Sequence, residues 1–189
     1  MNVGKLLEIV NALAPLDYAF DDDFVGITVG SQNSKVSGLA VAHELEHSVL
    51  DYSITNNINT LITYHPPPLQ KIIKEDGTET LEEDSLTKKF RESGLNIITI
   101  HTAQDVCNGG NADSLVNLFK MTETKVFAHT TGEFGAGRFG NIQKTSNKKF
   151  IKTVESKLNT KVLRTNEYFQ NIKDIDTVAI LPGSGTQFI

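Results

Sequence analysis

The chain has 189 residues, of which 39% are hydrophobic and 22% charged, which is enough for one or two small domains with a hydrophobic core. Its formal net charge is −5, and its lysines and arginines are scattered along the sequence. This argues against nucleic-acid binding, because affinity for phosphate depends on clustered cations. No apolar stretch approaches membrane-spanning length, and the single cysteine, Cys107, excludes an internal disulfide.

The first segment of the chain predicts an amphipathic helix that ends before Pro15. Its apolar positions recur at helical spacing: Val3, Leu6, Leu7, Val10 and Leu13. Glu8 lies within the apolar face and no basic start precedes it, so the segment does not have the pattern of a secretory signal. Because Cys107 also lies in a polar stretch that suits a reducing compartment, we expect the protein in the cytoplasm.

Residues 36–101 alternate between short apolar runs and helical segments. The apolar runs are typical of strands buried on both faces, and they cover residues 36–42, 59–65 and 95–101. The expected helices cover residues 46–57, with Val49, Tyr52 and Ile54 facing inward, and 79–94, with Gly94 as the C-cap. This alternation predicts an α/β fold of mostly parallel sheets covered by helices.

From residue 125 the pattern changes, and we expect a second α/β segment at 125–189, C-terminally incomplete, after an N-terminal α/β domain at 1–124. A helix is expected over 147–160, with strands over 125–132, 137–143, 161–167 and 176–185. The glycine-rich residues 133–137 are better explained as a hairpin corner that needs positive φ than as a phosphate-binding loop.

The stretch TLITYHPPPLQ, residues 60–70, runs from apolar residues into Tyr64, His65 and three consecutive prolines. Proline locks φ and removes an amide donor, so the backbone just after His65 is held extended. Such rigidity indicates that the side chain of His65 has to be aimed.

Two expected strands lead directly into histidines, His65 and His101, and Asp105 follows four residues after His101. Ligands in open α/β sheets bind at the carboxyl ends of the strands, so we expect both imidazoles to face one crevice. Imidazole nitrogen and carboxylate oxygen are ligands for Zn, Mn or Fe. The set predicts a divalent-metal site, and the alternative is that the two histidines only hydrogen-bond loop backbone.

Other candidate motifs favour structural roles. His43 and His47 are four residues apart, but His43 ends an expected strand and His47 begins a helix, so a helical metal-binding pair is not expected. A capping or solvent-facing role is favoured for both, and His129 is assigned no chemistry. The Gly-Ser-Gly-Thr sequence at 183–186 lacks the lysine of a P-loop.

Five blocks of the sequence, taken in order, resemble the Nif-three-like family, whose members are often described as GTP cyclohydrolase I type 2 homologues. The blocks are DFVGITVGS (23–31), LITYHPPPL (61–69), HTAQDVCNGGNADSL (101–115), GAGRFGNI (135–142) and VAILPGSGTQFI (178–189). The resemblance implies the Nif-three-like α/β fold and an active site with two divalent metal ions. It also implies ring-shaped homo-oligomers, such as hexamers, and hydrolysis of a small molecule.

The resemblance assigns roles to three residues of this chain. The family segment that matches 61–69 reads His-His-Pro, so His65 corresponds to the second histidine ligand. Asp105 corresponds to the carboxylate that bridges the metals, and His101 lines the site.

The sequence also departs from the family pattern. Tyr64 stands at the position of the first histidine, and a neutral phenol is a poor ligand for such ions at neutral pH. Phe24 stands where the family usually has Asn. The family's last segment, whose His and Glu complete the ligand set, is expected beyond Ile189, so we expect a truncated member.

Three functions are therefore considered. The first is a metal-dependent hydrolase whose metal-bound water attacks a small phosphate-containing or nucleotide substrate. The second is a metal-poor, catalytically inactive scaffold or regulatory subunit that keeps the fold and the oligomer contacts. The third and weakest is a nucleotide-binding module that uses the Gly-Ser-Gly-Thr sequence.

Overall fold

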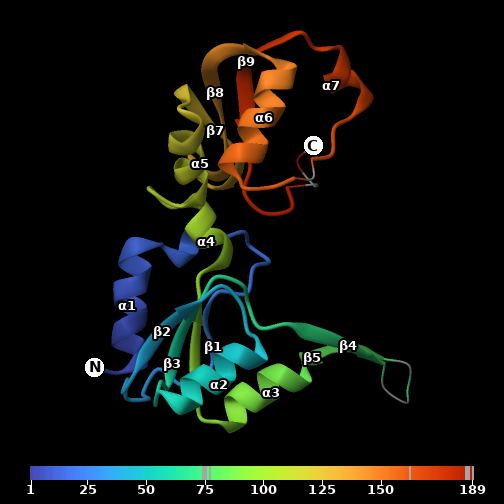
Figure 1. The fold of residues 1–189 in the computed structure, drawn as a ribbon. Helices are drawn as coiled ribbons and strands as arrows, with labels where there is room; N and C mark the ends of the chain where they lie inside the picture. Colours follow the sequence, from blue (N-terminus) through green and yellow to red (C-terminus); the bar gives the residue numbers. More distant parts are fainter. Residues whose placement is uncertain (74–75, 77, 162, 186–187, 189) are drawn as a thin grey trace. The chain divides into compact units, whose positions relative to one another are not determined.

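The computed structural model describes residues 1–73, 76, 78–161, 163–185 and 188. They form two compact units, Met1–Cys107 and Asn108–Ile189 (Figure 1). The boundary expected at residue 124 falls inside strand β7 (Thr122–Thr131), and helix α5 (Asn111–Phe119) precedes that strand in the second unit. None of the helices among the described residues is long and apolar enough to cross a membrane.

The first unit is built on a four-stranded sheet in the order β1-β6-β3-β2. Strands β2, β3 and β6 are mutually parallel, as the sequence predicts, whereas β1 runs antiparallel to β6. The strands are β1 (Gly26–Val29), β2 (Leu39–Ala42), β3 (Thr60–Thr63) and β6 (Asn96–Thr99). Their parallel order brings the carboxyl ends of β2, β3 and β6 to one edge of the sheet.

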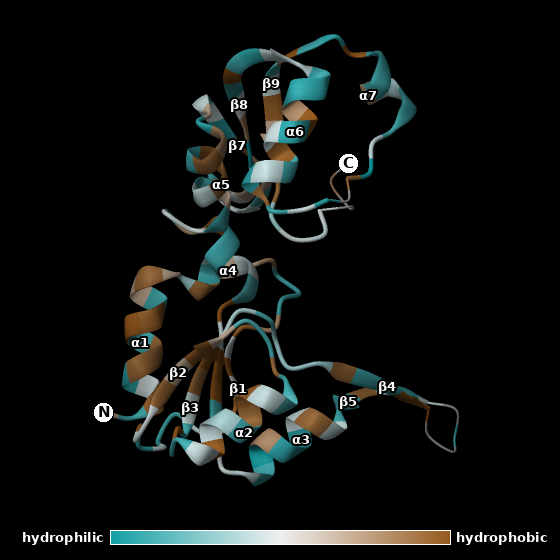
Figure 2. Cartoon of the chain, in the orientation of Figure 1, coloured by the Kyte–Doolittle hydropathy of each residue, from teal (hydrophilic) through white to brown (hydrophobic). Residues whose placement is uncertain are grey.

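Helices cover both faces of this sheet (Figures 1 and 2). Helix α1 (Val3–Leu13) packs on one face, where its Leu6 contributes to the same core cluster as Ile62 and Ile98. Helices α2 (His47–Thr55) and α3 (Ser85–Glu92) pack on the other, where Phe90 is fully buried in a cluster with Leu61. Successive strand residues point to opposite faces, which explains why neighbours such as Leu61 and Ile62 enter different clusters.

The residues after the three prolines form a hairpin instead of leading directly to a helix. Strand β4 (Leu69–Ile73) pairs antiparallel with β5 (Glu79–Glu83) in a separate two-stranded sheet. The prediction of one helix over 79–94 was therefore wrong in its first part. Helix α3 begins only at Ser85, because Asp84 caps it by accepting a hydrogen bond from the Thr87 amide at 2.7 Å.

Two burial predictions in the first unit were also wrong. Strand β2 is an edge strand, so Leu39 and Val41 are exposed where burial on both faces was expected. Helix α2 buries Leu50 and Ser53, whereas Tyr52 and Ile54 are exposed. The helix therefore turns a different face to the sheet than its larger apolar residues indicate.

The second unit contains an antiparallel three-stranded sheet in the order β7-β8-β9. Strand β8 (Phe134–Ser146) lies between β7 and β9 (Asp174–Ile180), so the expectation of mostly parallel sheets does not extend to this unit. A tight turn joins β7 to β8, and Gly132 takes a φ of +54°, which favours glycine.

Helices α5 and α6 (Asn147–Lys157) pack on this sheet and on each other. The rings of Phe119 and Phe150 lie 6.4 Å apart between centroids, and the Lys157 ammonium donates to the Leu118 carbonyl at 2.6 Å. The helix predicted over 147–160 is confirmed over Asn147–Lys157.

The strand predicted over 161–167 was wrong within the described residues. Residues 163–166 form no strand, and Asn166 instead caps the short helix α7 (Glu167–Asn171) by accepting a hydrogen bond from the Phe169 amide at 2.8 Å. Residue 162 lies outside the described residues.

Candidate functional site

A group of rings gathers at the carboxyl edge of the first sheet. His43 follows β2, Tyr64 and His65 follow β3, and His101 follows β6 as the first residue of helix α4 (His101–Val106). The ring centroids of His43 and His65 lie 4.5 Å apart, those of Tyr64 and His101 5.5 Å, and those of His65 and His101 5.7 Å. We call these four residues, together with Asp23 and Asp105, the edge cluster. The rings of His65 and His101 therefore lie close together, and the crevice that both were expected to face stays a prediction.

Asp105 is buried in helix α4 and is held by Tyr64. The phenol hydroxyl of Tyr64 lies 2.9 Å from one carboxylate oxygen of Asp105 and 3.0 Å from the other. Both oxygens thus lie within hydrogen-bond distance of one donor, which supplies part of the hydrogen bonding that a buried carboxylate requires. Tyr64 is therefore directed at the residue that the family resemblance assigns to metal bridging.

Asp23 holds the other side of the cluster through His101. The Nδ1 atom of His101 lies 2.6 Å from Oδ1 of Asp23, while Oδ2 accepts hydrogen bonds from the amide and the hydroxyl of Thr102. Asp23 reaches this edge because β1 runs antiparallel to β6, so the residues before β1 lie where the parallel strands end. Sequence reasoning did not assign Asp23 this role, because strand direction cannot be read from the apolar pattern of β1.

The contact shifts the titration of both partners. The hydrogen bond to Asp23 raises the pKa of His101 above its ordinary 6.5 against the opposing effect of burial, and the negative charges of Asp23 and Asp105 add to the rise. Burial alone would raise the pKa of Asp23, but the hydrogen bonds from His101 and Thr102 outweigh it and lower that pKa below 3.8. The pair thus favours a cationic imidazole beside an anionic carboxylate.

His65 is half-buried and is less constrained than His101. Its Nδ1 lies 3.5 Å from a carboxylate oxygen of Glu44, and its ring contacts those of Tyr64 and His43. The prolines that follow hold its backbone, and its amide donates to the His43 carbonyl at 2.8 Å. These contacts connect the ends of β3 and β2.

His43 is the residue that the sequence reasoning underestimated. Its imidazole stacks on the Tyr64 ring with centroids 5.2 Å apart and planes inclined by 10°. The rule that selected His65 and His101, a histidine directly after a parallel strand, applies equally to His43. His47, by contrast, begins α2 as expected, so no helical pair forms with His43.

The edge cluster does not match the donor set of a two-metal centre. Within the described part of the chain, no group of three or more His, Cys, Asp or Glu side chains is arranged to hold a metal ion. Both oxygens of Asp105 accept from Tyr64, and Nδ1 of His101 is engaged by Asp23. The contact of His101 with Asp23 involves Nδ1 alone, and a carboxylate on one ring nitrogen is the usual partner of a histidine that ligates through the other.

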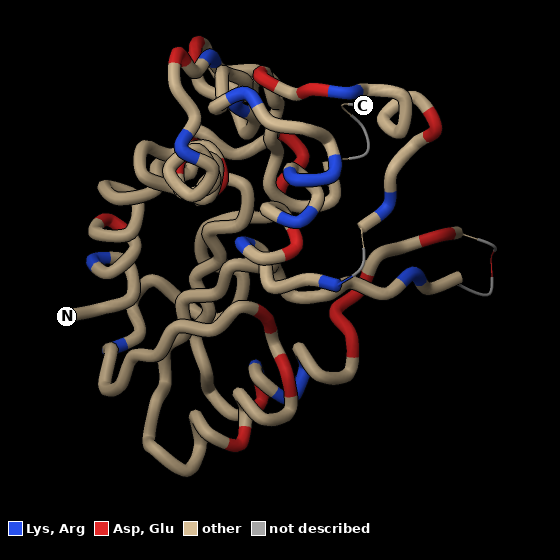
Figure 3. The backbone as a smooth tube through the Cα atoms, turned by 45° about the horizontal axis from the view of Figure 1, so that its top comes forward, with Lys and Arg blue, Asp and Glu red and all other residues tan. Residues whose placement is uncertain are grey.

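The remaining candidates lie apart from the cluster. His129 is an exposed residue of β7. The Gly-Ser-Gly-Thr motif is described only through Gly185, and Thr186 lies outside the described residues. Lys and Arg are interspersed with Asp and Glu along the described backbone (Figure 3).

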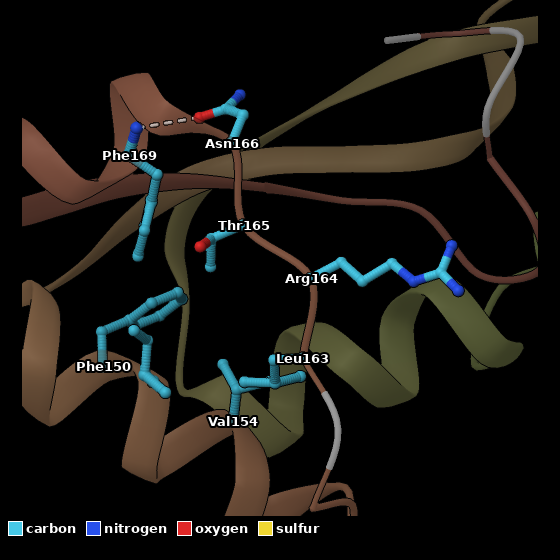
Figure 4. Close-up of a pocket in the computed structure, with 8 residues that line it drawn as sticks. Phe150, Val154, Leu163, Arg164, Thr165, Asn166 and Phe169 are labelled. Carbon is cyan, nitrogen blue, oxygen red and sulfur yellow. Dashed lines mark hydrogen bonds between the residues drawn. The ribbon is translucent and has the colours of Figure 1, made fainter.

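The second unit contains an apolar cavity of about 290 Å³ between α6 and residues 163–169. Figure 4 shows Phe150, Val154, Leu163 and Phe169 turned toward one another, while Arg164 points away from them. With its charged lining residue directed outward, this cavity offers fewer groups for chemistry than the edge cluster does.

Comparison with known proteins identifies relatives of the whole chain. The profile of the Duf34/NIF3 (NGG1p interacting factor 3) family matches residues 1–189. A protein from Lactococcus lactis named GTP cyclohydrolase 1 type 2 homolog is 26% identical over 189 residues, which cover 98% of this chain and 70% of the relative. The Bacillus subtilis protein of the same name is 26% identical over 130 residues, 69% of this chain and 34% of the relative.

The fold is also found among solved structures. A Bacillus cereus protein related to NIF3 superimposes with a TM-score of 0.78 at 17% identity, and the match covers all of this chain and 78% of that protein. Sequence identity this low supports the fold alone. The matched region is about a third of the length of the Bacillus subtilis relative and 70% of that of the Lactococcus lactis relative.

Proposed function

Because this chain belongs to the Duf34/NIF3 family, we propose that it is a metal-poor member, a catalytically silent subunit that keeps the family fold. The observation that carries the proposal is the hydrogen bond from Tyr64 to both oxygens of Asp105. The phenol hydroxyl lies within hydrogen-bond distance of both oxygens that a metal-bridging Asp105 would use. The proposal concerns this chain and not the family as a whole.

The Tyr64 hydroxyl and a cation compete for the same acceptor atoms. A carboxylate that bridges two metals directs its lone pairs at them, whereas both oxygens of Asp105 already lie within 3.0 Å of the Tyr64 hydroxyl. The stacking of His43 on the Tyr64 ring helps to keep the hydroxyl at these oxygens. The contacts of Tyr64 therefore oppose metal entry.

The remaining imidazoles do not compensate for this competition. His101 contacts Asp23 through Nδ1 at 2.6 Å, and His65 is the other imidazole that the sequence selected. Functional zinc sites have about three protein ligands and an open position. Because no three such side chains among the described residues are arranged around one point, we expect the edge cluster to bind Zn, Mn or Fe only weakly.

The experiment compares the metal content of three purified proteins. The parent, Tyr64→His and Tyr168→His are each incubated with Zn, Mn or Fe, desalted and measured by plasma mass spectrometry. Tyr168 is an exposed tyrosine of the second unit, so its variant controls for the gain of one histidine. We expect far less than one metal per chain in the parent and in Tyr168→His, and a several-fold rise in Tyr64→His.

Near-stoichiometric metal in the parent, lost on Asp105→Asn, would overturn this proposal in favour of the metal-dependent hydrolase. That second function is favoured by one observation, the convergence of His43, His65 and His101 with buried Asp105 on a single sheet edge. Its test is turnover of a chromogenic phosphate ester with added Mn. If His65→Ala leaves the rate unchanged, the hydrolase function is excluded for this site.

A further inference from the structure

The cavity of the second unit is bounded on one side by helix α6. Its apolar lining includes Phe150 and Val154 from α6 together with Leu163 and Phe169, and Figure 4 shows these side chains turned toward one another. All four are only partly buried, and α6 has no buried residue. The apolar side of α6 is therefore left partly open at the cavity, where an apolar ligand would remove it from water.

The volume of the cavity limits the size of a ligand. Known ligand pockets have volumes of about 300–1,000 Å³, and an apolar cavity of about 150 Å³ can bind benzene. The present volume of about 290 Å³ therefore suits an aromatic ring with a short side chain. The rings of Phe150 and Phe169 favour an aromatic ligand, because aromatic rings attract one another beyond the effect of the area that they bury.

Two polar residues of the lining can bind the polar end of such a ligand. Figure 4 shows the short side chain of Thr165 directed toward the apolar side chains, and the guanidinium of Arg164 extended the other way. Within the described part of the chain, no carboxylate forms an ion pair with Arg164. The amide oxygen of Asn166 already accepts from the Phe169 amide. A hydroxyl and a guanidinium are both donors, so the lining suits an acceptor such as a carboxylate.

The segment around the cavity is basic, although the whole chain is acidic. Residues 144–164 contain seven lysines and arginines and one acidic residue, Glu155, in a chain with a net charge of −5. Three of these cations, Lys148, Lys149 and Lys152, are exposed along α6. A local excess of positive charge raises the concentration of anions nearby, so the surroundings of the cavity favour an anionic ligand over a neutral one.

We infer that the cavity binds a small aromatic carboxylate. The ring of the ligand would lie among Phe150, Val154 and Phe169, and its carboxylate would accept hydrogen bonds from Thr165 and Arg164. Burial of the ring removes the open apolar side of α6 from water, and the carboxylate lies within the basic segment. The inference concerns the second unit alone and does not depend on the metal content of the edge cluster.

Binding of α6 to an anionic membrane is the alternative for a basic amphipathic helix. It would require that the apolar side of α6 face the lipid. This side instead faces the interior of the second unit, because α6 packs on β8 and β9 and the ring of Phe150 lies 6.4 Å from that of Phe119. A small ligand that enters the cavity is therefore favoured.

The fluorescence of an indole ligand tests the inference. The chain contains no tryptophan, so indolepropionate can be titrated with the protein without a protein background. Indolepropanol, which has the same ring but a neutral end, is the matched probe. We expect saturable binding of indolepropionate and roughly ten-fold weaker binding of indolepropanol, because the charge-assisted hydrogen bonds are lost. No saturable binding of indolepropionate, or equal affinity for the two probes, would overturn the inference.

Two variants with matched controls test where the ligand binds. Val154→Phe fills the cavity and should weaken binding roughly ten-fold or more, whereas Val41→Phe makes the same change at an exposed position of the first unit. Arg164→Gln should weaken binding of indolepropionate but not of indolepropanol, and Lys35→Gln, at another exposed cation, should change neither.

Thermal denaturation checks that each variant is folded. Arg164→Gln changes an exposed side chain, so it tests the inference even where Val154→Phe lowers stability. Unchanged affinity of folded Val154→Phe would refute the location of the ligand. Unchanged affinity of Arg164→Gln for indolepropionate would refute the carboxylate as the group that is recognised.

Discussion

The two main sheets of this chain differ in the direction of their strands: the sheet of the first unit is mostly parallel and that of the second unit is antiparallel. In the first unit, three parallel strands end at the same edge, and the residues that follow them, among them His43, Tyr64 and His101, lie within ring contact. In the second unit the strands are antiparallel, so neighbouring strands end at opposite edges. Its ion pair, buried Arg138 with half-buried Asp113, instead joins helix α5 to strand β8. Parallel strands bring polar side chains together at one edge, where they can form a functional site. In the antiparallel sheet, the ion pair of Asp113 with Arg138 instead holds helix α5 against the sheet.

The largest expected effect on stability comes from removing the ion pair of Asp113 with Arg138 in the second unit. Arg138 is buried, and its guanidinium donates to Asp113 at 2.9 Å and to the carbonyls of Gly135 and Gly137. Arg138→Ala should lower the free energy of unfolding by about 2–4 kcal/mol, because it removes all of these hydrogen bonds from the interior of the second unit. Chemical denaturation measures the loss. Lys144→Ala, which removes an exposed ion pair with Asp174, should cost at most about 1 kcal/mol.

Within the edge cluster, the largest effect on stability is expected from Tyr64. Tyr64→Phe removes the hydroxyl that both oxygens of buried Asp105 accept, so it should lower the free energy of unfolding by about 1–3 kcal/mol. Urea denaturation near neutral pH measures this loss. In the double variant with Asp105→Asn the two losses should not add, because both single changes break one interaction. Strict additivity would show that the hydrogen bond contributes nothing to stability.

The dependence of stability on pH should separate the contribution of Asp23 from that of His101. The pKa of Asp23 is lowered, so its contribution to stability is present above about pH 3.8 and is lost as the pH falls through the folded-state pKa. The pKa of His101 is raised, so its contribution is present below about pH 6.5 and is lost as the pH rises through the folded-state pKa. The pair therefore stabilises the fold most between these values. The melting temperature of Asp23→Asn should therefore fall less than that of the parent below about pH 3.8 and above about pH 6.5, and an unchanged profile would contradict the assignment.

The smallest effect is expected at His43. This side chain is exposed and its main contacts are with the rings of Tyr64 and His65, so His43→Ala should cost less than about 1 kcal/mol. His43→Phe, which keeps a planar ring, should restore most of the loss. Thermal denaturation of the two variants measures the difference. A loss as large as that of Tyr64→Phe would show that stacking, and not the hydrogen bond, fixes the tyrosine.

The sequence predicted three of the four strands of the first sheet, β2, β3 and β6, and it predicted that His65 and His101 lie close together, because apolar runs and the parallel order determine both. Strand β1 was not predicted. The sequence also did not predict the partners of the residues in the edge cluster. The Tyr64 contact with Asp105 depends on the turn that starts α4 directly at His101, and the Asp23 contact depends on the direction of β1. Neither feature has a local sequence signal. Strand β5 was missed for a related reason, since its acidic residues resemble a helix start and only pairing with β4 makes them a strand.

The separation in sequence of the cluster's partners has a consequence for how the protein folds. Asp23 and His101 are 78 residues apart, and Tyr64 and Asp105 are 41 apart. Contacts of this kind require the closure of long loops before they stabilise anything, so they are expected to form late in folding. A nascent chain released only as far as the prolines that follow β3 has His43 and His65 but lacks both His101 and Asp105. The edge cluster would therefore form only when the whole first unit has folded. The Tyr64 hydroxyl would shield Asp105 from water only at that last stage.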